Sequence, residues 1–137
     1  MAIQTIGFIG LGNMAKAIIG GILKNELVKP ENIIGSSATQ ETMQAVARRA
    51  DLLVLAVKPG ILPVVIEEIR DVVDDRKLVL SVAAGKTTKW LSAQFEHPVK
   101  IIRCMPNTPA LVQEGCSAVC RSSAVSEEEL NEVLQIV

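Results

Sequence analysis

The chain has 137 residues, with 14 basic and 15 acidic side chains and a formal net charge of -1. Hydrophobic residues make up 49% of it but aromatic residues only 2%, so we expect one core built from aliphatic side chains. No stretch concentrates Lys or Arg, which argues against a nucleic-acid partner, and no apolar run is long enough for a membrane span.

The first predicted elements are a strand, a glycine turn and a helix. An apolar run at residues 6–9 leads into GLGNMA, after which apolar residues recur with helical spacing as far as Leu23. ENIIGSS (31–37) predicts a second short strand. ADLLVLAVKP (50–59) predicts a third strand that is apolar on both faces, which is typical of a parallel sheet covered by helices.

The rest of the chain repeats this alternation. We expect a helix over 61–73, a strand over 77–85, a short helix over 87–95 with a Thr cap, and a strand over 99–107. A last strand at 116–122, at an edge of the sheet, precedes a helix over 126–137 that opens with Ser126 and Glu129 at capping-box spacing. The pattern predicts an α/β fold: a Rossmann-like, doubly wound, mostly parallel sheet with helices on both faces.

In such a sheet, ligands bind at the carboxyl ends of the strands. The first of these ends carries GLGNMA, which has the spacing G-x-G-x-x-A of a dinucleotide-binding turn. There Gly10 would permit the tight turn, Gly12 would let the backbone approach a pyrophosphate, and Ala15 would let the helix pack on the strand. A turn that needs small residues only for packing is the alternative, and Gly7, inside the strand, is expected to serve packing.

The end of the second strand bears on the choice of dinucleotide. Ser36 and Ser37 stand where an acidic residue would hold the ribose hydroxyl of NAD. Two hydroxyls and no carboxylate favour NADP(H), with NAD(H) still possible, although no Arg adjoins the serines. Both serines can equally be simple turn residues.

Other reactive side chains fit poorly with catalysis. The three cysteines have neither C-x-x-C spacing nor partner histidines, so we expect no metal site. Cys104 is expected in the core. The odd number of cysteines fits a reducing, cytoplasmic location best. His97 is expected at the surface. Lys58 is expected to be solvated, and the alternatives are a nucleophile, for which VKPG offers neither a base nor an apolar cage, or a phosphate contact. No general acid or base can be assembled, so no catalytic residue is predicted; a bound nicotinamide cofactor would carry the chemistry.

Four segments, GFIGLGNMA, ADLLVLAVKP, SVAAG and RCMPNTPALVQEG, together resemble the amino-terminal domain of pyrroline-5-carboxylate reductase. The resemblance implies a reductase that transfers hydride from NAD(P)H to the C=N carbon of a small imine in proline biosynthesis, as part of a dimer-based homo-oligomer. It implies the following cofactor-binding residues: Ile9, Gly10, Leu11, Gly12, Asn13, Met14, Ser36, Ser37, Ala56, Val57, Lys58, Pro59, Val82, Ala83 and Ala84. It also implies that Met105, Pro106, Asn107 and Thr108 lie between substrate and nicotinamide.

The chain departs from that family in two respects. Family members usually have a further strand and helix where this chain has only residues 36–51. That strand lies at an edge of the family's sheet, so we expect that the sheet could form without it. The family's carboxyl-terminal helical domain, which forms the dimer and supplies substrate-binding hydroxyls, is not matched by these residues. We therefore expect residues 1–137 to be one dinucleotide-binding domain that binds NADP(H) weakly or moderately and turns over little by itself.

Two other functions remain open at this point. A 3-hydroxyacid dehydrogenase would share GFIGLGNM but should not carry CMPNTPALVQEG. A non-catalytic module that senses NADP would bind the cofactor and alter a partner contact.

Overall fold

The computed structural model describes residues 3–36, 40–82, 86–106 and 116–136. Its strands are β1 (Ile6–Ile9), β2 (Ile33–Ser36), β3 (Leu52–Leu55), β4 (Leu78–Ser81), β5 (Lys100–Pro106) and β6 (Cys116–Arg121). Its helices are α1 (Asn13–Lys24), α2 (Gln40–Arg49), α3 (Leu62–Ile69), α4 (Thr88–Phe95) and α5 (Glu127–Ile136), with 3-10 turns at Pro30–Asn32 and Arg70–Val72.

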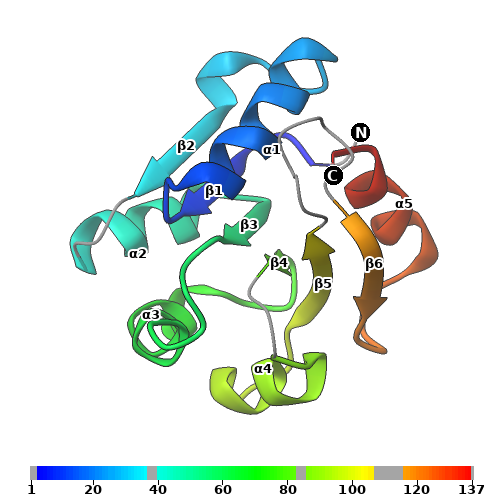
Figure 1. The fold of residues 1–137 in the computed structure, drawn as a ribbon. Helices are drawn as coiled ribbons and strands as arrows, with labels where there is room; N and C mark the ends of the chain where they lie inside the picture. Colours follow the sequence, from blue (N-terminus) through cyan, green and yellow to red (C-terminus); the bar gives the residue numbers. More distant parts are fainter. Residues whose placement is uncertain (1–2, 37–39, 83–85, 107–115, 137) are drawn as a thin grey trace.

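The strands form one sheet in the order β2-β1-β3-β4-β5-β6 (Figure 1). The first five strands in this order are parallel, and β6 pairs antiparallel with β5 at the far edge. The predicted Rossmann-like fold, including the edge position of the last strand, is therefore confirmed. Strand order reverses between β1 and β3, the place where such sheets bind ligands.

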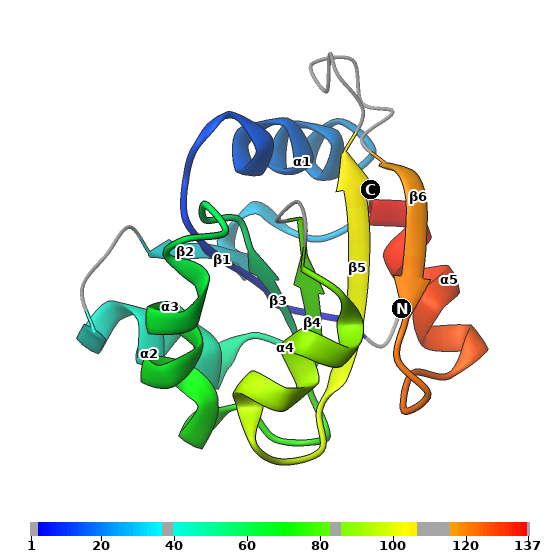
Figure 2. The ribbon, with the colours of Figure 1, turned by 60° about the horizontal axis from the view of Figure 1, so that its bottom comes forward.

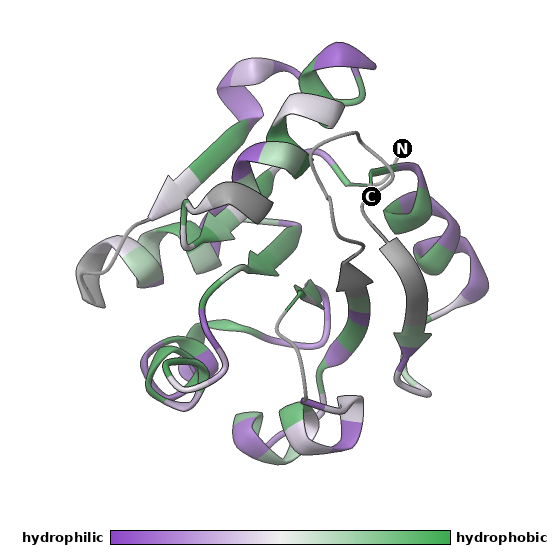
Figure 3. Cartoon of the chain, in the orientation of Figure 1, coloured by the Kyte–Doolittle hydropathy of each residue, from purple (hydrophilic) through white to green (hydrophobic). Residues whose placement is uncertain are grey.

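Helices cover both faces of the sheet, as Figure 2 shows. Alternate residues of each strand point to opposite faces, and the buried side chains accordingly fall into two clusters. One cluster joins the strands to α2, α3 and α4, and the other joins them to α1 and α5. In Figure 3 the central strands are hydrophobic and hydrophilic residues are distributed over the helices, which fits a sheet buried on both faces.

Helix α2 is an element that our sequence interpretation missed. It occupies the short connection between β2 and β3, and its residues Met43, Val46 and Ala47 are buried in the core. A Cβ added to Gly7 of β1 would stand 2.6 Å from Val46 Cγ1 and 2.9 Å from Ala50 Cβ. The predicted packing role of Gly7 is therefore confirmed, and the neighbour it accommodates is α2.

Several boundaries differ from the predicted ones. Strand β3 ends at Leu55 and β4 at Ser81, earlier than predicted. The predicted helix over 61–73 is α3 followed by a 3-10 turn. Both predicted caps are present: Thr87 accepts from Trp90 N–H, and Ser126 and Glu129 exchange hydrogen bonds of 3.0 and 3.1 Å.

Among the residues that the structure describes, no strand pairs with the outer edge of β2, and the sheet forms nevertheless. Strand β2 is thus an edge strand, and the predicted tolerance of the fold to the short connection is confirmed. None of the helices among these residues has the length and apolar character that crossing a bilayer requires.

Candidate functional site

Four predicted strand ends lie side by side at the carboxyl edge of the sheet, those of β1 to β4. Gly10 N–H donates to Ser36 C=O at 2.9 Å, Ala56 N–H to Ile9 C=O at 2.8 Å and Val82 N–H to Leu55 C=O at 3.3 Å. These bonds extend the sheet ladder by one row beyond the strands. The fold thus brings the glycine turn together with Ser36, Ala56 and Val82, which the sequence places far apart.

Gly10 sits at the reversal of strand order, against β3. Its φ is +92°, and a Cβ there would stand 2.5 Å from Ala56 O and 2.8 Å from Ala56 C. Both the left-handed backbone and the close contact demand glycine. The predicted tight turn at Gly10 agrees with this geometry.

Gly12 lies at the start of α1 and faces open space. It is the N-cap residue, with φ of -78°, and nothing lies within 4 Å of the position its Cβ would take. No side chain caps the helix, and its first turn holds no acidic residue. Free N–H groups and the positive end of the helix dipole favour an anion such as a pyrophosphate. The structure therefore offers both the space and the donors that a dinucleotide phosphate needs at Gly12.

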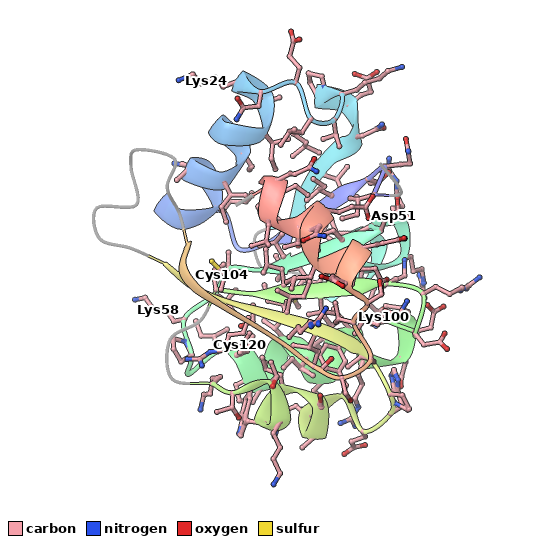
Figure 4. All side chains as sticks on the ribbon, turned by 90° about the vertical axis from the view of Figure 1, so that its right-hand side faces the viewer. Lys24, Asp51, Lys58, Lys100, Cys104 and Cys120 are labelled. Carbon is pink, nitrogen blue, oxygen red and sulfur yellow. The ribbon has the colours of Figure 1, made fainter. Side chains whose placement is uncertain are left out.

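The charge around this edge is positive. Three segments at this edge follow β1, β3 and β4, at residues 10–16, 56–61 and 86–90. They contain Lys16, Lys58, Lys86 and Lys89 but neither Asp nor Glu. Lys58 is exposed at the end of the molecule opposite to Asp51 and Lys100 (Figure 4). Its carbonyl accepts from Ile61 N–H at 2.9 Å. Such a surface favours the approach of a ligand that carries several phosphates.

The two serines at the end of β2 differ in what the structure shows. Ser36 is 3% exposed, and its hydroxyl shares a 2.8 Å hydrogen bond with the Thr42 hydroxyl of α2. Because Ser36 is buried, little of its surface is open to a ligand, although its hydroxyl could accept from Thr42 and still donate a hydrogen bond elsewhere. Ser37, the other residue predicted to contact the 2'-phosphate, lies outside the described residues.

Further predicted site residues also fall outside the region that the structure describes. They are Ala83 and Ala84 after β4, and Asn107 and Thr108 after β5. Asn13 and Met14 begin α1, and Met105 and Pro106 end β5, so their backbone positions lie at the expected edge. Val82 is 8% exposed and belongs to the core cluster on the α1 side, while Val57 packs against the cluster on the other side.

Arg103 is a residue that the sequence interpretation left without a role. It pairs with Ser81 in the last ladder row of β4 and β5, next to the carboxyl edge. Its Nε atom is buried and has no hydrogen-bond partner, and none of the ion pairs found among the described residues includes Arg103. The sequence of a strand does not show whether a buried arginine Nε atom finds a hydrogen-bond partner, because that depends on how distant segments pack around it.

The remaining candidate side chains lie away from this edge or in the core. His97 Nε2 is 2.7 Å from Arg70 C=O, and His97 is partly buried rather than fully at the surface. Cys104 is 2% exposed, which confirms its predicted core position. Its sulfur is disulfide-bonded, whereas Cys120 is free and exposed.

A family model described as "NADP oxidoreductase coenzyme F420-dependent" matches residues 5–85, which contain the glycine turn, α2 and the AVKP segment. The chain belongs to this family. Pyrroline-5-carboxylate reductase of Escherichia coli K12 is 42% identical to it over 149 aligned positions, which cover 97% of this chain and 55% of that enzyme. The resemblance to the amino-terminal half of these reductases is thereby confirmed.

Solved structures agree with this family. The pyrroline carboxylate reductase of Plasmodium falciparum with NADP bound has a TM-score of 0.85 and 32% identity, covering 97% of this chain and 53% of that one. The pyrroline-5-carboxylate reductase of Coxiella burnetii has a TM-score of 0.84 and 29% identity, covering 97% and 55%. The chain spans about half the length of these relatives.

The alignment with the Escherichia coli enzyme has 149 positions, more than the 137 residues of this chain. That relative therefore carries residues with no counterpart here. A short connection between β2 and β3, with β2 at the edge of the sheet, is consistent with this difference.

Proposed function

We propose that this family member is the dinucleotide-binding half of a pyrroline-5-carboxylate reductase, and that the complete protein reduces 1-pyrroline-5-carboxylate to L-proline with NADPH. The observation that carries the proposal is the 42% identity to the Escherichia coli reductase over 97% of the chain. The carboxyl edge supports it, because a glycine with positive φ, a helix start without a side-chain cap and several lysines lie there.

The proposed binding mode follows the carboxyl edge from β2 to β5. The start of α1 would hold the pyrophosphate, Ser37 with Ser36 the adenosine end, and residues 56–59 one wall of the cofactor site. Residues 82–84 would lie beside the nicotinamide, and residues 105–108 between the nicotinamide and the imine. The cofactor, when bound, supplies the hydride for the C=N carbon. The chain's own residues bind and orient it and keep water from that end of the site.

The name of the family model supports NADP(H) as the cofactor, as does the NADP bound to the Plasmodium relative. We further propose a place in proline biosynthesis, a cytoplasmic location and a homo-oligomeric complete protein. The dimer and much of the substrate pocket would come from the part that corresponds to the other half of the relatives. The present residues alone would bind NADPH and turn over little.

Gly12 offers a direct test, because a side chain there has space in the free protein but would occupy the place proposed for the pyrophosphate. Gly12→Val should lower NADPH affinity at least about tenfold, as expected for loss of close backbone approach. The unfolding midpoint should change little, since nothing lies within 4 Å of that Cβ. NADPH fluorescence titration of this chain is the measurement. Gly20→Ala, in α1 with equally open space, is the matched control and should bind NADPH normally.

The competing functions predict different results for the complete protein. A 3-hydroxyacid dehydrogenase would act on 3-hydroxyisobutyrate and not on 1-pyrroline-5-carboxylate, and a sensing module would bind NADPH without turning over either compound. No NADPH binding at millimolar cofactor, or no reduction of 1-pyrroline-5-carboxylate by the complete protein, would reject our proposal.

A further inference from the structure

Leu11 and Gly35 join the glycine turn to the edge strand of the sheet. A Cβ added to Gly35 would stand 2.8 Å from Leu11 Cδ2, 3.5 Å from Cδ1 and 3.6 Å from Cγ. The end of the Leu11 side chain thus occupies the space that a side chain at position 35 would need. A side chain at position 35 would require the end of the Leu11 side chain to move away from β2.

This contact contributes little to the hydrophobic core. Leu11 is 43% exposed and Gly35 is also exposed, whereas the neighbouring Phe8 and Ile9 are fully buried. The stabilisation gained from such a contact is small, because much of the leucine remains in water. A role in folding therefore does not account for the fit between these two residues.

The position of the contact relates it to the candidate cofactor site. Leu11 lies between Gly10 and Gly12 of the turn, and Gly35 precedes Ser36, whose carbonyl accepts from Gly10 N–H. Gly35 pairs with Phe8, so its missing side chain would point to the α1 side of the sheet. The Ser36 hydroxyl points to the opposite side, toward α2. Leu11 is therefore the side chain that covers the α1 side of the β2 end.

We propose that Leu11 contacts the adenosine half of the cofactor and that Gly35 is the positioning residue that holds Leu11 in place for it. The inference rests on the proposed function, which puts adenosine at the end of β2. The apolar face of the nucleoside covers the exposed part of Leu11. A side chain at position 35 displaces Leu11 into the space that adenosine takes.

The affinities of the complete protein for three ligands test this arrangement. NADPH is the whole cofactor, 2',5'-ADP probes its adenosine end, and reduced nicotinamide mononucleotide probes the other end. Gly35→Ala should lower the affinity for NADPH and for 2',5'-ADP about fivefold. Leu11→Ala should have the same effect, because it loses a partly exposed apolar contact. The double variant should bind no more weakly than Leu11→Ala alone, because the added methyl group then has nothing to displace. Nicotinamide mononucleotide affinity should stay unchanged in all three.

Thermal unfolding of each variant checks that the fold is retained, and Gly20→Ala, with open space around its Cβ, is the control glycine. If Gly35→Ala lowers 2',5'-ADP affinity as much in the Leu11→Ala background as in the wild type, the positioning role is overturned. Unchanged 2',5'-ADP affinity in Leu11→Ala would overturn the adenosine contact. Both outcomes presuppose that the wild type binds NADPH. A wild type that binds none rejects the proposed function, and this inference with it.

Discussion

The backbone of Gly10 lies so close to Ala56 that a Cβ at position 10 would stand 2.5 Å from the Ala56 carbonyl oxygen. The contact holds the glycine turn against the segment after β3, at the point where strand order reverses. It fixes the spacing between two walls of the candidate cofactor site, and it also belongs to the hydrogen-bonded edge of the sheet.

Gly10→Ala should therefore impair both stability and cofactor binding. A non-glycine residue at φ of +92° is strained, and its Cβ would force the turn away from β3. We expect a loss of about 2 kcal/mol in the free energy of unfolding, and at least tenfold weaker NADPH binding. Urea unfolding and NADPH titration measure the two effects. Gly20→Ala should slightly stabilise α1 instead, and a Gly10→Ala protein with wild-type values would contradict our account of the turn.

Gly7→Ala should affect stability without a direct effect on the cofactor. The new methyl group would meet Val46 Cγ1 at 2.6 Å in a fully packed region between β1 and α2. Overpacking of this kind costs about 1–3 kcal/mol, measured as a lower urea midpoint at unchanged slope. Adding Val46→Ala should recover part of the loss by making room. If the second substitution only lowers stability further, the close approach of α2 to β1 is not the cause.

The serines at the end of β2 should separate into a structural and a ligand-binding residue. Ser36→Ala leaves the Thr42 hydroxyl without its 2.8 Å partner, and we expect a loss of about 1 kcal/mol in stability with little change in cofactor preference. Ser37→Ala should leave stability nearly unchanged and lower the ratio of NADPH to NADH affinity several-fold, as for loss of a hydrogen bond to a charged phosphate. The measurements are unfolding curves and titrations with both cofactors. An unaltered ratio in Ser37→Ala would count against the 2'-phosphate contact.

Glu129 should make stability depend on pH in the acidic range. Burial acts to raise the pKa of Glu129, but hydrogen bonds from Ser126 N–H and from Lys100 Nζ, at 2.9 Å, hold it below its ordinary value of 4.5. Because the folded-state pKa is the lower one, this stabilisation is present above the ordinary value and is lost as pH falls through the folded-state value. Glu129→Gln should cost about 1 kcal/mol at neutral pH.

Urea unfolding of the wild type and of Glu129→Gln at several pH values between 7 and 3 tests this prediction. The difference between the two proteins should shrink on acidification, since a protonated glutamate resembles glutamine. Glu128→Gln, at an exposed neighbouring position, is the matched control. A difference that stays constant with pH would mean that the ion pair to Lys100 contributes nothing to the effect.

The part of the site that could be predicted from the sequence rests on local patterns. The spacing of Gly10, Gly12 and Ala15 follows from the geometry of a strand, a turn and a helix that are continuous in the chain. The runs of apolar residues marked where the other strands end, and parallel pairing then placed those ends at one edge. The alternation of strands and helices was sufficient to predict the fold class.

Other features depend on packing between segments that are distant in the sequence. The hydrogen bond between Ser36 and Thr42 requires knowing which face of β2 meets α2, and a strand end gives no such information. No element was predicted between β2 and β3, although Met43, Val46, Ala47 and Ala50 recur there with the spacing of a helix. The unpaired Nε atom of Arg103 could be recognised only once the helices were in place around it.

The short connection after β2 has a consequence for how molecules of this protein meet each other. With no described strand beyond β2, one side of its backbone can pair with an extended segment of another molecule, which is the first step of aggregation. Two features counter this. The strand has only four residues, and Pro30, just before it, has no N–H to donate to an added strand. The short edge strand is thus a poor template for pairing with a second molecule.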